Sequence, residues 1–258
     1  MTTTRKLDYA ERGAVIVVAD AAALAQCGAE LVATTMQEAV AARGIATIAL
    51  SGGSTPKAMG ALFLSEPYRS TIPWEAMRIF WGDERRVPLD DPESNAGEAM
   101  RGYLDHLPIP KSNIHPFPTA GDPDAAAAIY AETVSSMVPG APVPLFDLIL
   151  LGMGDDGHTA SLFPFTSALM KADELVVANP VEKLHTTRLT FTERLINAGR
   201  TVAFLAGGAG KKERLHEVLD GALERDRLPS QRIRPTSGNL IWIVDEAAAA
   251  SLNRNGIE

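Results

Sequence analysis

The chain passes from an apolar stretch, Phe146 to Leu151, directly into the run Gly152-Met153-Gly154-Asp155-Asp156-Gly157-His158-Thr159-Ala160-Ser161-Leu162-Phe163-Pro164. The apolar stretch is typical of a buried strand, and the glycine-rich run is typical of a turn. A histidine and two carboxylates therefore follow a rigid element, where a scaffold can hold titratable groups against a ligand. This junction predicts the position of a catalytic or binding site. The same pattern, an apolar run followed by polar or glycine-rich residues, recurs along the chain.

Short apolar runs followed by polar or glycine-rich residues recur along the chain. An opening strand is expected at Ala14 to Val18, and the later runs are Ala46 to Leu50, Met77 to Trp81, Leu145 to Leu151, Thr201 to Leu205 and Asn239 to Val244. Helical patterns separate them, among them Ala21 to Ala42, Ala125 to Met137 and Lys211 to Leu223. The pattern predicts one α/β domain over residues 1–258, an open, mostly parallel, doubly wound sheet of a modified Rossmann type with helices on both faces. Ligands bind such sheets outside the carboxyl ends of the strands, where the strand order reverses.

The bulk composition is that of an ordinary globular protein. Of 258 residues, 46% are hydrophobic and 22% are charged, so neither disorder nor a fibrous repeat is indicated. The formal net charge of -8 argues against nucleic acid and membrane surfaces as partners, because binding them needs a dense basic surface. An anionic ligand must therefore find a local cluster of cations.

Several features of the sequence bear on the compartment. No segment approaches the roughly 18 uncharged apolar residues of a membrane span, and the run Met1-Thr2-Thr3-Thr4-Arg5-Lys6-Leu7-Asp8 lacks the apolar core of a secretory leader. Cys27 is the single cysteine, so no disulfide forms within one chain, which fits a reducing compartment. We expect a cytoplasmic protein that is a monomer or a weak homo-oligomer.

A first candidate site is the turn Ser51-Gly52-Gly53-Ser54-Thr55-Pro56-Lys57. Its glycines permit a tight backbone, Ser54 or Thr55 can cap a helix, and Pro56 suits a first helical turn. Several N–H groups would then converge on an anion, which predicts a phosphate cradle; a plain strand-turn-helix connection is the alternative. The pattern is neither a Walker loop nor a nucleophile elbow.

A second candidate is the charged run Trp81-Gly82-Asp83-Glu84-Arg85-Arg86-Val87-Pro88. One interpretation is a solvated loop. The other is a site in which an arginine stabilises a carbonyl oxygen as negative charge develops, while Asp83 anchors that arginine or a sugar hydroxyl.

The residues Gly152 to Gly157 match Gly-x-Gly-x-x-Gly, with Asp173 downstream. We reject a dinucleotide site, because Asp155 and Asp156 would repel a pyrophosphate, and because the acid of that motif ends a strand whereas Asp173 precedes an apolar run. No cofactor is expected.

His158 stands out in the same run. A neutral imidazole titrates near physiological pH and can take a proton from water. The other histidines, His106, His115, His185 and His216, lack the spacing of metal ligands, so no metal is expected.

Two later cations complete the candidate site. Arg188 precedes an apparent helical stretch, and Lys211 follows Gly207-Gly208-Ala209-Gly210 beyond an expected strand. Each is an ordinary surface charge when taken alone. Together with the turn Ser51 to Thr55 they can clamp a phosphate, although the pattern does not decide between Lys211 and Lys212.

These motifs together resemble the 6-phosphogluconolactonases of the glucosamine-6-phosphate isomerase/6-phosphogluconolactonase family. The resemblance spans almost the whole chain in order. It rests on Ser51 to Pro56, Asp83-Glu84-Arg85 with Val87-Pro88 and Ser94-Asn95, Gly152 to Pro164, Arg188 to Thr192, Leu195 to Ala198, Gly208 to Lys211 and Ser237 to Ala248.

The resemblance implies hydrolysis of 6-phospho-D-glucono-1,5-lactone in the oxidative branch of the pentose phosphate pathway, with a small phosphosugar lactone as partner. It implies that His158 is a general base on water and that Arg85 stabilises the oxyanion. Asp156 and Asp83 would position ring hydroxyls, the water or the imidazole. The residues implied to hold the phosphate are Ser51, Gly52, Gly53, Ser54, Thr55, Arg188 and Lys211.

Two alternatives remain. Glucosamine-6-phosphate deaminases share the fold and related motifs, but their Asn-Glu pair before the proline is absent from Thr159 to Pro164. A catalytically silent sugar-phosphate sensor is the other alternative, and the chain lacks a helix-turn-helix extension that would act on DNA.

Overall fold

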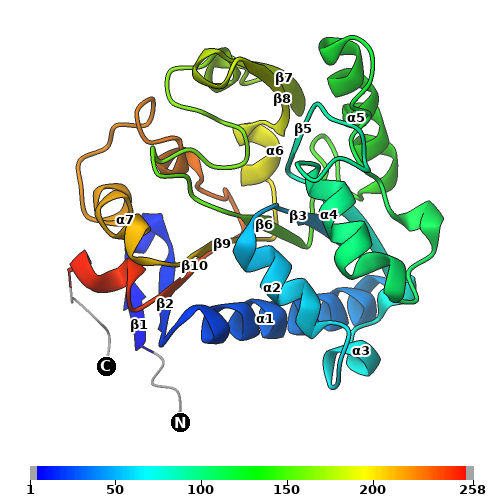
Figure 1. Cartoon of the computed structure of the whole chain (residues 1–258), viewed down its shortest axis with the longest axis horizontal. Helices are drawn as coiled ribbons and strands as arrows, with labels where there is room; N and C mark the ends of the chain where they lie inside the picture. The colour runs from blue at the N-terminus through cyan, green and yellow to red at the C-terminus, as the bar shows by residue number, and fades with distance from the viewer. Residues whose placement is uncertain (1–4, 254–258) are drawn as a thin grey trace.

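The computed structural model describes residues 5–253 of the chain (Figure 1). Residues 1–4, which carry part of the expectation about a leader, and residues 254–258 lie outside this range. The strands are β1 (Arg5–Asp8), β2 (Ala14–Val18), β3 (Ala46–Leu50), β4 (Met77–Trp81), β5 (Asp83–Arg85), β6 (Leu148–Leu151), β7 (Val176–Val181), β8 (Thr186–Phe191), β9 (Thr201–Ala206) and β10 (Asn239–Asp245). The α-helices are α1 (Ala21–Arg43), α2 (Ser54–Leu62), α3 (Tyr68–Thr71), α4 (Asn95–Gly102), α5 (Pro123–Met137), α6 (Glu193–Asn197) and α7 (Lys212–Leu219).

The central element is a seven-stranded sheet in the order β1-β2-β10-β9-β6-β3-β4. Its strands pair in parallel except for β1, which runs antiparallel to β2. The expected α/β class and mostly parallel sheet are confirmed. Every residue of β3 and β6 is buried, which is why these strands read as continuous apolar runs.

Two expected boundaries are wrong for local reasons. The strand expected from Leu145 begins at Leu148, because Leu145 donates its N–H to the carbonyl of Pro139 (2.8 Å) and is part of a turn. The helix expected to reach Leu223 ends at Leu219. Asp220 is the C-cap, and the N–H of Gly221 turns back to the carbonyls of His216 and Glu217 (both 3.2 Å).

A second sheet is absent from the sequence-based expectations. It has three antiparallel strands in the order β5-β8-β7. The charged segment Asp83 to Arg85 is the strand β5, and its Glu84 is fully buried, so the solvated-loop interpretation is wrong. Arg188 lies inside the strand β8 and pairs with Arg85 across the two strands.

Helices and the small sheet cover the central sheet from two sides. α1 packs on β10 and β3, while α5 packs on the small sheet (Figure 1). Asp20 caps the start of α1, where its side chain accepts from the N–H of Ala23, and Gly44, in the left-handed region, caps its end. On the other side, the hydroxyl of Tyr130 in α5 accepts from the N–H of Trp81 at 3.0 Å and ties the helix to the end of β4.

The topology brings four loops to one edge of the sheet. The strands β9, β6, β3 and β4 are neighbours, so the segments that follow them lie at adjacent carboxyl ends. The chain adds β4 on one side of β3 and then returns to add β6 on the other, which is the reversal of order where open parallel sheets bind ligands. Within residues 5–253, no helix is both long and apolar enough to cross a membrane.

The contact between α2 and α4 gives a prediction about stability. A Cβ on Gly60 of α2 would lie 2.2 Å from Cδ1 of the buried Tyr103, which follows α4. We expect Gly60→Ala to lower the free energy of unfolding by about 1–3 kcal/mol through overpacking, measured by denaturant titration. Gly102→Ala is the control, because no described heavy atom lies within 4 Å of its added Cβ; equal effects of the two substitutions would contradict the packing argument.

Candidate active site

The four loops enclose a pocket of about 400 Å³ at the carboxyl edge of the sheet. Each loop contributes part of the wall. The lining residues are Ser51, Gly52 and Gly53 after β3, Asp83, Arg85 and Asn95 after β4, Gly152, Met153, Gly154, Asp155, His158 and Ala160 after β6, and Lys211 after β9.

The loop after β6 is folded tightly around its glycines. The N–H of Gly154 donates to the carbonyl of His158 (2.8 Å), and the N–H of Gly157 donates to the carbonyl of Gly154 (3.0 Å). A Cβ on Gly154 would lie 2.0 Å from Nδ1 of His158. The imidazole therefore sits directly over this glycine, and a residue with a side chain would displace it.

His158 is held by two neighbours, Asp156 and Phe163, and Lys183 contacts both of them. Its Nδ1 lies 2.6 Å from Oδ1 of Asp156, and its ring stacks on Phe163 with centroids 4.1 Å apart. Lys183 donates to the other carboxylate oxygen of Asp156, and its Nζ lies 4.8 Å from the centroid of the Phe163 ring. The imidazole is thus fixed at one nitrogen and along one face.

The protonation of Asp156 determines which imidazole nitrogen is free. Partial burial raises the pKa of this carboxyl, but the hydrogen bonds from His158 and Lys183 outweigh that effect and hold the pKa well below its usual range. An ionised carboxylate only accepts hydrogen bonds, so Nδ1 of His158 carries the proton. In the neutral imidazole the lone pair then lies on Nε2, which can act as a base.

Asp83 and Arg85 point to the same pocket from β5. Oδ2 of Asp83 accepts from the hydroxyl of Ser161 at 2.7 Å, and the backbone carbonyl of Asp83 accepts from the amide of Asn95 at 3.1 Å. Arg85 donates to the carbonyl of Glu93 at 2.5 Å. The contact with Ser161 connects the segment after β4 with the loop after β6, while the other two contacts hold the segment after β4 together.

Glu84, between these two residues, is fully buried. Its Oε1 accepts from the N–H groups of Arg85 (2.7 Å) and Asn95 (2.8 Å), and its Oε2 accepts from the N–H of Ala96 (2.8 Å) and the hydroxyl of Ser94 (3.1 Å). Burial raises the pKa of Glu84, while the backbone N–H donors act in the opposite direction. The carboxylate fixes β5 to the first turn of α4 and so sets Arg85 and Asn95 relative to each other.

The turn after β3 offers unpaired polar groups to the pocket. The Ser51 hydroxyl is buried, and within the described residues it has no hydrogen-bond partner. Gly53 precedes α2 as its N-cap, at a φ of 108°, and no described side chain caps the helix, so its first N–H groups remain available to an anion. A Cβ on Gly52 would lie 1.9 Å from Oδ1 of Asn95, which explains why this turn needs glycine.

The three candidate cations differ in whether they line the pocket. Lys211 lines the pocket and forms an ion pair with Asp155, whereas Lys212 lies 3.5 Å from Glu213. Arg188 lies opposite Arg85 in the small sheet but is not among the lining residues. Burial, and then the charge of Arg85, lower the pKa of Arg188.

The expected site residues therefore fall into two groups. The pocket gathers His158, Arg85, Asp83, Ser51, Gly52, Gly53 and Lys211. Asp156 lies behind His158, while Ser54, Thr55 and Arg188 do not line the pocket. The sequence analysis missed Glu84, Asn95 and Lys183: Asn95 appeared only as part of a motif, and no pattern connects Lys183 with Asp156.

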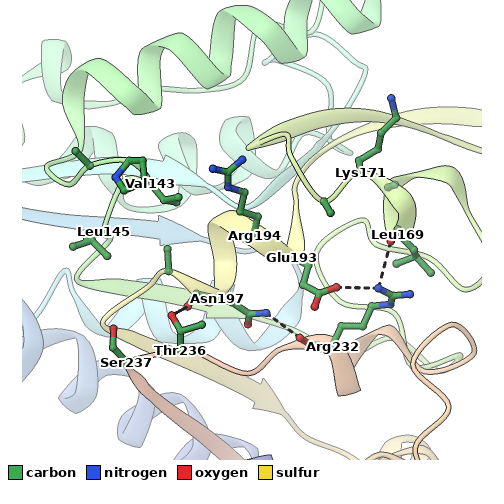
Figure 2. Close-up of a pocket in the computed structure, with 15 residues that line it drawn as sticks. Val143, Leu145, Leu169, Lys171, Glu193, Arg194, Asn197, Arg232, Thr236 and Ser237 are labelled. Atoms are coloured by element: carbon green, nitrogen blue, oxygen red, sulfur yellow. Dashed lines mark hydrogen bonds and ion pairs between the residues drawn. The ribbon is translucent and has the colours of Figure 1, made fainter.

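Another pocket lies at the opposite edge of the sheet (Figure 2). It has a volume of about 640 Å³ and is lined by segments that precede β6, β7, β9 and β10. Several of its polar groups bind one another, as Figure 2 shows for Arg232, Glu193 and Asn197. Arg232 pairs with Glu193 at 2.9 Å, and Asn197 donates to the carbonyl of Arg232 at 3.0 Å. None of the expected site residues lines it, so the smaller pocket is the candidate active site. Among residues 5–253, no group of three or more His, Cys, Asp or Glu side chains is arranged to hold a metal ion.

Known proteins resemble this chain over most of its length. The family model described as glucosamine-6-phosphate isomerases/6-phosphogluconolactonase matches residues 19–242. A 6-phosphogluconolactonase of Synechocystis sp. is 45% identical over 86% of this chain and 90% of its own, and one of Nostoc sp. is 40% identical over 93% and 98%. The structure of the Trypanosoma brucei 6-phosphogluconolactonase superposes with a TM-score of 0.82 at 30% identity, covering 93% of this chain and 98% of that one.

The buried carboxylate of Glu84 gives a prediction. In Glu84→Gln an NH2 group replaces an oxygen that faces only donors, so we expect the free energy of unfolding to fall by about 1–3 kcal/mol. The control is Glu98→Gln, because Glu98 pairs with Lys57 at the surface, and such a pair contributes little. Denaturant titration of both variants tests this, and equal stability of Glu84→Gln and the wild type would contradict it.

Proposed function

Since this chain belongs to the glucosamine-6-phosphate isomerase/6-phosphogluconolactonase family, we propose that it hydrolyses 6-phospho-D-glucono-1,5-lactone to 6-phospho-D-gluconate, a step of the oxidative pentose phosphate pathway. The observation that carries the proposal is the contact between Nδ1 of His158 and Asp156. It leaves Nε2 as a base in a pocket that also holds Arg85 and Lys211.

In the proposed reaction, Nε2 of His158 takes a proton from water as the water oxygen bonds to the lactone carbonyl carbon. Arg85 stabilises the negative charge that develops on the carbonyl oxygen. The bond between the carbonyl carbon and the ring oxygen then breaks, and His158 returns its proton to that ring oxygen. The products are a hydroxyl group and a carboxylic acid, which ionises.

The aspartates have different proposed roles. Asp156 keeps the imidazole oriented and stabilises the imidazolium that forms during the reaction, and Lys183 holds Asp156 in place. Asp83, fixed by Ser161, accepts a hydrogen bond from a ring hydroxyl of the sugar.

The phosphate is proposed to lie between the turn Ser51 to Thr55 and Lys211. The buried Ser51 hydroxyl, for which the described residues supply no partner, supports this placement. Arg188, which lies opposite Arg85 in the small sheet, is proposed to add positive charge that attracts the phosphate. Binding the phosphate at this distance from the carbonyl would orient the reacting end of the substrate.

We extend the proposal to the organisation of the protein. Residues 1–258 act as one lactonase domain in the cytoplasm, as a monomer or a weak homo-oligomer. One hydrophobic cluster that runs from Leu7 to Leu252 supports a single domain. Sedimentation analysis across a range of concentrations tests the state of association.

The first functional prediction concerns the base. We expect His158→Ala to lower turnover of the lactone ~10²–10⁴-fold while 6-phosphogluconate still binds, because the phosphate contacts remain. The measurement is lactone hydrolysis with the spontaneous background subtracted. The control is His106→Ala, since His106 is exposed in the short helix Leu104–His106; equal rates for His158→Ala and the wild type would remove the imidazole from the mechanism.

The same preparation tests the alternative. A glucosamine-6-phosphate deaminase would release ammonia from glucosamine 6-phosphate, and we expect none. This alternative is less supported, because the relatives described above are 6-phosphogluconolactonases and the run Thr159 to Pro164 follows their pattern.

A further prediction separates the two adjacent lysines. Lys211→Met should raise the KM for the lactone and the Kd for 6-phosphogluconate about ten-fold or more, since a hydrogen bond to a charged group contributes about 1.5–3 kcal/mol. Lys212→Met removes the same charge one residue away and should change both little. Titration calorimetry measures the Kd values, and a larger effect at Lys212 would reverse the assignment.

A further inference from the structure

The proposed reaction leaves the carboxylate of Asp155 unused, although it lies in the pocket. Asp155 and Lys211 both line the cavity and form an ion pair with each other. The lysine side chain is 26% exposed and the aspartate side chain 84% exposed. The cation proposed to meet the phosphate is therefore already bound to a carboxylate of the same chain.

The two adjacent aspartates differ in what holds them. Asp156 is bound on both of its oxygens, by His158 and by Lys183. The backbone of Asp155 is anchored by Arg214, whose Nε donates to its carbonyl at 2.8 Å. Its mainly exposed carboxylate can turn into water at little cost while the backbone stays in place.

We infer that Asp155 competes with the phosphate of the ligand for Lys211, and so weakens phosphosugar binding and speeds release of the phosphorylated product. The inference rests on the proposed function. When the phosphate enters, it must displace the carboxylate and also meets its negative charge. When the product leaves, Asp155 takes Lys211 back, so the lysine does not lose its partner.

Such a competitor suits a hydrolase. Once the bound phosphate has oriented the reacting end, a stronger contact with it is made equally to substrate, transition state and product, so it lowers KM without raising kcat further. Binding that is too tight retains the product, and product release limits many enzymes. An ion pair with an exposed partner is worth little, so the effect is a tuning of affinity.

The test is equilibrium binding of 6-phosphogluconate to Asp155→Asn. We expect the Kd to fall about two- to five-fold, the range that an exposed ion pair supports, and the dissociation rate constant to fall with it. Glu213→Gln is the matched control, because it removes the same charge from a nearby residue that pairs with Lys212, and it should leave the Kd unchanged. Gluconate, which lacks the phosphate, should bind both variants as it binds the wild type.

A double-mutant cycle with Lys211→Met isolates the competition. In that background Asp155→Asn should tighten 6-phosphogluconate binding clearly less, since the shared partner is gone. An unchanged Kd in the single variant, or the same tightening in both backgrounds, would overturn the inference and leave the lactonase proposal standing. A wild-type protein that binds no 6-phosphogluconate and hydrolyses no lactone would overturn both.

Discussion

The pocket depends on four buried parallel strands, β9, β6, β3 and β4, that end at one edge of the same sheet. Parallel pairing forces the loops after these strands to be neighbours, although about 160 residues separate the first loop from the last. Each of these strands ends next to one residue or segment of the pocket wall, and the residues placed in this way are Ser51, Asp83, His158 and Lys211. The apolar core therefore determines which distant polar residues meet.

Three carboxylates hold the loops around the pocket, and each has a different role that follows from how deeply it is buried. Glu84, fully buried among donors, acts on the backbone and holds Arg85 and Asn95 in register. Asp156, partly buried and bound twice, orients the imidazole. Asp155, mostly exposed, is bound on one side and can exchange its partner. The same functional group, a carboxylate, thus serves in backbone anchoring, in side-chain orientation and in reversible pairing.

Local sequence predicted the parallel strands of the central sheet and most of the pocket, because strands buried on both faces show as apolar runs and tight turns show as glycines. The antiparallel edge strand β1 was not predicted, because Arg5 to Asp8 is a short, mostly polar segment. The small sheet was missed because β5 is a three-residue strand of charged residues, whose burial depends on partners far along the chain. Lys183 was missed for the same reason, since its contact with Asp156 depends on how β7 and β8 fold back. The position of Arg188 relative to the pocket could not be predicted either, because it depends on the register in which β8 pairs with β5 and places Arg188 opposite Arg85.

The position of His158 over Gly154 limits how this scaffold can diversify. Any other amino acid at position 154 would put an atom where the ring lies, so substitutions there would be removed by selection as long as the histidine is needed. A directed-evolution library aimed at new ligands would keep that codon fixed. It would instead randomise a wall position whose side chain is exposed, such as Asp155.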